Sequence, residues 1–252
     1  MMQRRQAQHI FSPSSSAVGS KTIAQWDFSD LGTLTFGVPE YIAKVADKSG
    51  NGHDFSQEVP ALRPRSVIHG GMYSAFFAAN HHMTSPYAAS LNPQVFDLFI
   101  VAERYNAPAF YPALISAAEM DSQHKGYRCG GDPANHSMCS EFSSALYDTF
   151  VWSPSNSFPE YTTVIYNMAV YWENANLFAK STINNAFPSP VENITGKFDV
   201  NDSEGSYMGG RENPDGYFTG FIKEIIMKKP LTEPDRLNMY RYLANKWGVS
   251  IA

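Results

Sequence analysis

Short runs of β-branched and aromatic residues, separated by turn-forming residues, recur along most of this 252-residue chain. Each run is bounded by Gly, Pro, Asn or Asp, which commonly end strands. The clearest runs are 22–28, 72–79, 95–105, 112–120, 161–172, 175–183, 206–210 and 216–227. Aromatic residues make up 14% of the chain and charged residues only 17%. This composition suits pleated, half-buried sheets. We therefore predict an all-β fold with one core and no internal repeat.

One short helix is expected near the C-terminus. Thr232 is suited to the N-cap, and Glu233, Pro234 and Asp235 suit the first turn. Gly248 follows the last position with helical periodicity and is expected to end the helix. Apolar residues recur at helical spacing in this segment: Leu237, Tyr240, Leu243, Ala244 and Trp247. The pattern predicts a helix whose apolar stripe lies against the sheets.

The first 21 residues differ from the rest of the chain. They are polar, Ser-rich and without periodicity, which predicts an N-terminal arm over 1–21 that adds nothing to the core of a domain over 22–252. No apolar run typical of a secretory signal or a membrane span is present, so we expect synthesis in a cytoplasm. The formal charge of −5 and the lack of a basic stripe argue against a nucleic-acid partner.

Cys129 and Cys139 lie on either side of a turn-forming Gly-Gly-Asp-Pro-Ala-Asn sequence, which predicts a hairpin that brings them close. A disulfide is one interpretation; two semi-buried free thiols are favoured, because a cytoplasm keeps cysteines reduced. A third interpretation is a zinc ion held by these cysteines with His124 and His136, although the spacing matches no common structural site.

Three segments together suggest a family. They are DKSGNGHDFSQ (47–57), GGRENPDGYFTGFIKEIIMKKPLT (209–232) and YLANKWG (242–248). In this order they resemble the laminin-G-like, concanavalin A-like jelly-roll domains of phage virion proteins and bacterial surface proteins. The resemblance implies a concanavalin A-like β-sandwich of two antiparallel sheets with one short C-terminal helix and ligand-competent loops. It implies no reaction.

The 47–57 segment admits two readings. Asn51-Gly52 suits a type I′ turn, and Asp47 is placed to close an Asx turn, so turn geometry accounts for the sequence. A phosphate-binding loop would need a Lys and a following helix, and both are missing. The alternative is a metal or glycan contact through Asp47, Asn51 or His53.

Catalysis has weak support in the sequence. Glu119 and Asp121 lie two residues apart, as paired carboxylates do in some jelly-roll glycanases, but the third position is Gln123. A glutamine cannot donate a proton to a leaving sugar oxygen. We predict that the protein is not an enzyme, with no catalytic residue and no required cofactor.

Glycan binding uses aromatic rings that stack on sugars and polar groups that bond hydroxyls. The expected ligand-binding residues are Trp152, Trp172, Tyr171, His124, Tyr127 and Arg128. Packing within the sheets is the competing explanation for each. Calcium is a further candidate through the oxygen-rich turn Asp199, Asn201, Asp202 and Glu204, although solvated loop acids explain that turn as well.

These observations lead to one functional expectation. The chain is predicted to be a non-enzymatic virion component of a phage, in the tail, a fibre or a capsid decoration, with glycan or host-surface binding through the jelly roll. Its arm is expected to contact other virion subunits in a homo-oligomer or larger assembly. A lectin-type carbohydrate-binding module is the alternative, and a glycoside hydrolase ranks below both.

Overall fold

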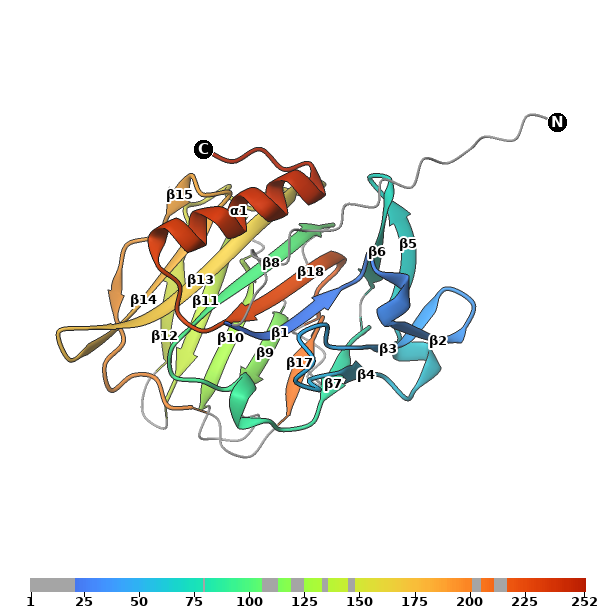
Figure 1. Cartoon of the computed structure of the whole chain (residues 1–252), viewed down its shortest axis with the longest axis horizontal. Helices are drawn as coiled ribbons and strands as arrows, with labels where there is room; N and C mark the ends of the chain where they lie inside the picture. The colour runs from blue at the N-terminus through green and yellow to red at the C-terminus, as the bar shows by residue number, and fades with distance from the viewer. Residues whose placement is uncertain are drawn as a thin grey trace.

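The computed structural model describes residues 21–78, 80–105, 113–118, 125–132, 136–144, 148–200, 205–210 and 217–252. In these residues the fold is all-β with one α-helix, as the sequence predicts (Figure 1). The strands are β1 (Thr22–Asp27), β2 (Leu34–Val38), β3 (Tyr41–Val45), β4 (Phe55–Ser56), β5 (Arg65–His69), β6 (Met72–Phe77), β7 (Met83–Ser85), β8 (Phe96–Arg104), β9 (Ala113–Ala118), β10 (Gly126–Asp132), β11 (Ser137–Ser143), β12 (Asp148–Trp152), β13 (Thr163–Glu173), β14 (Asn176–Ile183), β15 (Phe187–Pro188), β16 (Glu192–Asn193), β17 (Ser206–Met208) and β18 (Gly220–Lys228). The helices are α1 (Glu233–Trp247) and three 3-10 turns, η1 (Leu31–Thr33), η2 (Pro60–Leu62) and η3 (Ala89–Leu91).

Antiparallel pairing arranges the strands in two main runs. One run has the order β1-β18-β8-β13-β14. The other has the order β7-β17-β9-β10-β11-β12. The two are not separate sheets, because β6 pairs with β18 and the pairing continues through β5, β3 and β4 to β7. The expectation of two distinct sheets is therefore not confirmed; the strands form one large antiparallel sheet that nearly closes into a barrel.

The main core lies between these two runs. Successive side chains of a strand point to opposite faces, so each run contributes every second residue to the interior. Trp26, Ile100 and Tyr166 of the first run are fully buried in one cluster with Met138 and Phe142 of the second. The alternating apolar pattern that predicts strands therefore also fills this core.

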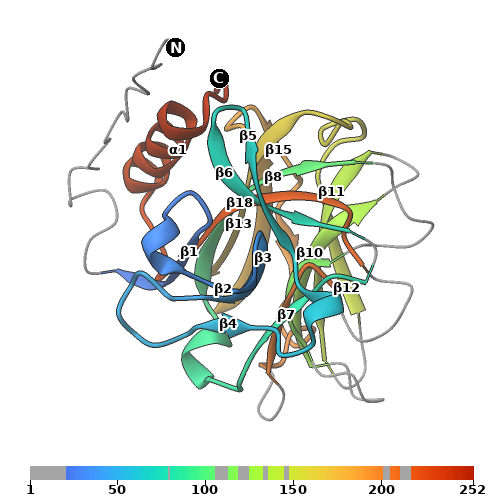
Figure 2. The same cartoon turned by 90° about the vertical axis from the view of Figure 1, so that its right-hand side faces the viewer.

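Helix α1 covers the opposite face of the first run (Figure 2). Its side chains Tyr240 and Leu243 are buried against Phe99, Ile165 and Ile226, which β8, β13 and β18 direct away from the main core. In Figure 2, α1 lies at the left and β10, β11 and β12 at the right, on opposite sides of the molecule. The second run therefore keeps its outer face clear of α1.

Both ends of α1 form where the sequence predicts them. The Thr232 hydroxyl accepts a hydrogen bond from the backbone N–H of Asp235, so Thr232 is the N-cap. Gly248 has a left-handed φ of 67° and ends the helix. The buried face is partly different from the expected one, because Arg236 and Met239 are buried while Leu237 is only half-buried.

The 47–57 segment turns the chain and docks on β1. The Asp47 carboxylate accepts hydrogen bonds from the backbone N–H groups of Gln25 at 2.9 Å, Ser49 at 2.9 Å and His53 at 3.2 Å. The Asn51 amide donates to the carbonyl of Ile23 at 2.8 Å. The predicted turn role is confirmed, because these polar side chains bond to the fold itself.

The predicted turn type is wrong. A type I′ turn at Asn51-Gly52 requires positive φ at both residues. Gly50 and Gly52 have φ of 83° and 80°, but Asn51 is not among the residues with positive φ. The two glycines supply the left-handed positions, and Asn51 is held between them by its bond to β1.

Candidate functional site

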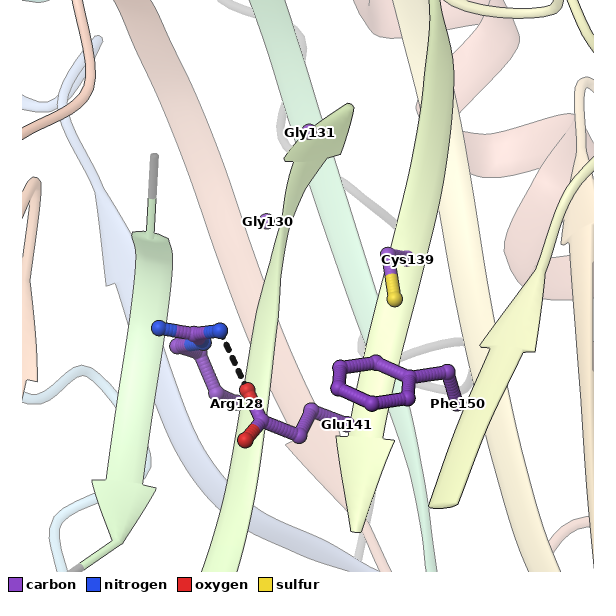
Figure 3. A pocket seen from close by; sticks show the side chains of 6 residues that line it. All are labelled: Arg128, Gly130, Gly131, Cys139, Glu141 and Phe150. Atoms are coloured by element: carbon purple, nitrogen blue, oxygen red, sulfur yellow. Dashed lines mark ion pairs between the residues drawn. The ribbon is translucent and has the colours of Figure 1, made fainter. Parts of the chain in front are cut away.

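The candidate site lies on the outer face of β10, β11 and β12. Strand alternation sends Tyr127 and Cys129 into the core and Arg128 outward. In the neighbouring strands, Glu141 pairs with Arg128, and Phe150 pairs with Glu141. One ion pair and one aromatic ring therefore lie side by side on this face (Figure 3).

Arg128 and Glu141 form an ion pair in which the guanidinium Nη2 contacts the carboxylate Oε2. Their side chains are only 18% and 15% exposed. The Ser143 hydroxyl also lies within reach of the same carboxylate, at 3.5 Å from Oε1. Because the pair is partly buried, salt screens it less than a pair in open solvent.

The pair borders a small hollow in the sheet, of about 10 Å³. Arg128, Gly130, Gly131, Cys139, Glu141 and Phe150 line it (Figure 3). Gly130 pairs with Cys139 and lies on the same strand face as Arg128, so no side chain fills that point of the hollow. The hollow therefore combines backbone, a charged pair and an aromatic ring.

A second aromatic ring lies beside Phe150. Phe150 and Trp152 are stacked with centroids 5.8 Å apart and an interplanar angle of 21°. Phe150 is 38% exposed, although phenylalanine is usually buried. Both rings come from β12, where residues two apart point to the same face. They form a platform suited to stacking on the apolar face of a sugar ring.

Strand register also aligns the site with residues of neighbouring strands. Thr84 of β7, Tyr207 of β17, Ser116 of β9 and Arg128 of β10 lie one beside the next. Glu141 and Phe150 follow on β11 and β12. Ser116 is completely buried, so it interrupts this row, and the site is limited to Arg128, Glu141 and Phe150.

Two of the predicted ligand residues meet at this site, namely Arg128 and Trp152. Tyr127 does not, because its ring is 2% exposed and its hydroxyl donates to the carbonyl of Leu91 at 3.2 Å. Its neighbour Arg128 faces outward only because successive residues of β10 alternate. We therefore place Tyr127 in the core and remove it from the candidate ligand residues. His124 lies outside the described residues.

Tyr171 and Trp172 lie elsewhere, at the end of β13. Trp172 is 49% exposed, and Tyr171 stacks on Phe178 of β14 with centroids 6.1 Å apart. Lys180 lies 6.0 Å from the centre of the Tyr171 ring. They form a second aromatic group at the β13–β14 hairpin, on a strand of the other run.

The two cysteines are buried and form no disulfide, so the prediction of reduced thiols agrees with the structure. The predicted hairpin forms as β10 and β11, but its register pairs Cys129 with Ser140 and Gly130 with Cys139. The thiols consequently point to opposite faces of the sheet. This offset rules out both a disulfide between them and a zinc site that uses the two together.

Several other predicted ligand residues lie outside the part of the chain that the structure describes. Glu119, Asp121 and Gln123 lie outside the described residues, as do Asn201, Asp202 and Glu204 of the calcium candidate. Within the described parts of the chain, no group of three or more His, Cys, Asp or Glu is arranged to hold a metal ion. In the same parts, no helix is long and apolar enough to cross a bilayer.

Sequence reasoning missed Glu141, Phe150 and Tyr207. Tyr207 lies in a short strand whose partners β7 and β9 are distant in sequence. Glu141 and Phe150 lie in strands that follow β10 directly, but only the pairing register shows that they face Arg128. A partial signal was present, because Phe150 and Trp152 are two apart in a run that starts at Asp148, a spacing that places both rings on one face of a strand.

Comparison with known proteins gives a fold and no family. No family model matches the chain. The search of curated proteins finds no match either. Among solved structures, Trypanosoma rangeli sialidase in complex with the inhibitor DANA matches over 88% of this chain, with 11% identity and a TM-score of 0.60. The match covers 33% of the sialidase, so this chain spans about a third of that protein's length.

Two further matches are to a binding domain and to one domain of an arabinanase. The binding domain of Paraclostridial Mosquitocidal Protein 1 matches 89% of this chain and 52% of its own, with 11% identity and a TM-score of 0.60. Domain 4 of AbnA, a GH43 extracellular arabinanase from Geobacillus stearothermophilus solved with arabinotriose, matches 87% of this chain and 98% of its own, with 12% identity and a TM-score of 0.56. Likenesses at this identity establish a shared β fold, consistent with the jelly-roll resemblance in the sequence.

Proposed function

We propose that this protein is a non-enzymatic glycan-binding protein that binds a sugar chain on the outer face of β10, β11 and β12. The observation that carries the proposal is the stacked Phe150–Trp152 pair beside the hollow and the Arg128–Glu141 ion pair. Rings supply stacking surface, and the charged pair supplies hydrogen-bonding groups for hydroxyls.

The comparisons support this choice of ligand class. Domain 4 of AbnA was solved with arabinotriose, and it matches this chain over nearly all of its own length. Arg128, Glu141 and Phe150 lie side by side across β10, β11 and β12 and would contact a sugar that stacks on the rings. We propose that the two runs of strands act as the two layers of a jelly roll, with the ligand on the layer that α1 leaves uncovered.

The carboxylate arrangement supports binding rather than hydrolysis. Glycosidases generally need two carboxyl groups on either side of the scissile bond. Glu141 is the one carboxylate among the six residues that line the hollow, and Arg128 holds it as an ion pair. The residues that line the hollow therefore lack the second carboxyl group that this mechanism uses.

The proposal is tested with a glycan array, followed by calorimetric titration of the best neutral oligosaccharide. Trp152→Ala and Phe150→Ala should each weaken binding by about tenfold, because each removes half of the stacking platform. Trp172→Ala is the matched control: it removes an exposed tryptophan from the β13–β14 hairpin. If Trp172→Ala abolishes binding while Trp152→Ala does not, the site lies at that hairpin and the proposed face is wrong.

We also propose that the protein belongs to a phage virion, with the N-terminal arm contacting neighbouring subunits. The support is the sequence resemblance and the arm's polar, Ser-rich composition. Light scattering after size exclusion tests this on the full chain and on a chain lacking residues 1–20. An oligomer that dissociates on truncation supports the assembly role, and two monomers of equal stability would contradict homo-oligomerisation through the arm.

A further inference from the structure

The charge of the hollow offers a way to identify which glycans it accepts. Arginine is the side chain that proteins most often use to bind a carboxylate, because its planar fork makes two parallel hydrogen bonds. Arg128 lines the same hollow as Phe150, beside the Phe150–Trp152 platform. It is therefore the cation that the carboxylate of an acidic sugar on that platform would bind. In this chain, however, Glu141 contacts that guanidinium.

The described neighbours of the pair do not restore a positive charge. Along the row, Arg128 and Glu141 are flanked by Ser116 on β9 and Phe150 on β12, which are uncharged. Ser143, the other side chain within hydrogen-bonding distance of the Glu141 carboxylate, is also uncharged. The six residues that line the hollow consequently contain one cation and one anion (Figure 3).

We infer that the Arg128–Glu141 pair makes this site selective for neutral glycans and that Glu141 excludes acidic ones. This inference rests on the proposed function. An incoming uronate or sialate carboxylate would compete with Glu141 for the same guanidinium and would meet a like charge at close range. A neutral sugar avoids this cost, because its hydroxyls donate to the carboxylate and accept from the guanidinium without breaking the pair.

The test is a gain of binding. Wild type, Glu141→Gln and Glu141→Ala are compared on an array that carries neutral arabinan and xylan oligosaccharides beside oligogalacturonates and sialylated glycans. Removing the carboxylate frees the Arg128 charge, so both variants should bind the acidic glycans about tenfold or more tightly than wild type. The gain should fall as salt is raised, because it depends on one charge pair near the surface.

Two controls isolate the cause. Glu58→Gln changes the net charge by the same amount at an exposed position between β4 and η2 and should give no gain. Arg128→Gln combined with Glu141→Gln should lose the gain, because the cation that binds the acidic sugar is gone. Thermal unfolding of each variant establishes that it is folded, and Glu141→Ala repeats the test if Glu141→Gln does not fold.

The outcomes separate this inference from the proposed function. Neutral binding by wild type with acidic binding gained in the Glu141 variants supports both. If wild type binds acidic glycans as tightly as neutral ones, the inference of selectivity is wrong but the proposed glycan binding is supported. The inference of selectivity is also wrong if the Glu141 variants show no gain in binding to acidic glycans. If neither wild type nor any variant binds a glycan, the proposed function fails and the selectivity fails with it.

Discussion

Arg236 of α1 donates two hydrogen bonds to the Asp97 carboxylate of β8, from Nε at 2.7 Å and from Nη2 at 3.2 Å. Asp97 is almost completely buried, and its second oxygen also accepts the backbone N–H of Leu231 at 2.7 Å. One buried carboxylate thus connects the first run of strands to the start of the helix and to the segment that leads into it.

Asp97→Ala should destabilise the fold by about 3–5 kcal/mol, because it removes the buried counter-charge of the Arg236 guanidinium and leaves only the exposed Glu233 carboxylate. Urea denaturation followed by far-ultraviolet circular dichroism measures the change. Glu40→Gln is the control, since it removes an exposed ion pair with Arg65 and should leave the unfolding midpoint unchanged. Equal effects of the two substitutions would show that the helix is not held by Asp97.

Asp47→Ala should destabilise the protein by about 1–3 kcal/mol. The substitution leaves the backbone N–H groups of Gln25, Ser49 and His53 without an acceptor, and an unmade hydrogen bond in a buried region is costly. Thermal denaturation checks this, with the exposed acid Glu173→Ala as control. If Asp47→Ala lost ligand binding at unchanged stability, the loop would be a binding site and not a structural turn.

The cysteines should behave as two reduced thiols of low reactivity. Burial raises the pKa of the Cys129 thiol to about 12, and the thiolate is the reactive form. We expect two free thiols by titration with a thiol reagent in denaturant, slow labelling of the folded protein, and the same melting temperature with and without reductant. A fall in melting temperature on reduction would contradict the register of β10 and β11.

Acid should weaken the contact between β1 and α1. Burial raises the pKa of the Asp27 carboxyl, but the nearby Lys246 and Lys48 ammonium groups outweigh it, so the pKa lies below its ordinary value of 3.8. A depressed pKa in the folded state means that the stabilisation is present above pH 3.8 and is lost as the pH falls through the folded-state pKa.

Asp27→Asn should therefore flatten the loss of stability below pH 4, as measured by urea denaturation from pH 7 to pH 2. Asp30→Asn is the matched control, because Asp30 also pairs with Lys48 but its carboxyl is more exposed. A wild-type curve that does not steepen below pH 4, or an unchanged slope in Asp27→Asn, would show that the pair with Lys246 does not stabilise the folded state.

Several features could be predicted because they depend on local chemistry. The ends of α1 follow from Thr232 and Gly248, whose side-chain oxygen and missing Cβ act within one helical turn. Strands such as β8 and β13 follow from their runs of β-branched and aromatic residues. The structural role of the 47–57 turn follows from its glycines and Asp47, although the turn type does not.

The candidate site was only half predicted. Arg128 was expected to bind a ligand and lines the hollow, and Trp152, also expected, stacks on Phe150 beside it. Tyr127 was expected on the same grounds but lies in the core. Alternation along β10 requires Tyr127 and Arg128 to point to opposite faces, but it does not say which face is buried. That choice depends on what packs against the strand.

The sequence by itself determined the β-strand rhythm, the single C-terminal helix and the turn that docks on β1, since neighbours along the chain fix backbone preferences. Only the tertiary structure decided which strands lie side by side, and therefore that Glu141 neutralises Arg128 and that Phe150 joins Trp152 beside them. The physical reason is that strand register is set by the hydrogen bonds and core packing of the folded sheet, and a shift of one residue would turn every one of these side chains to the other face.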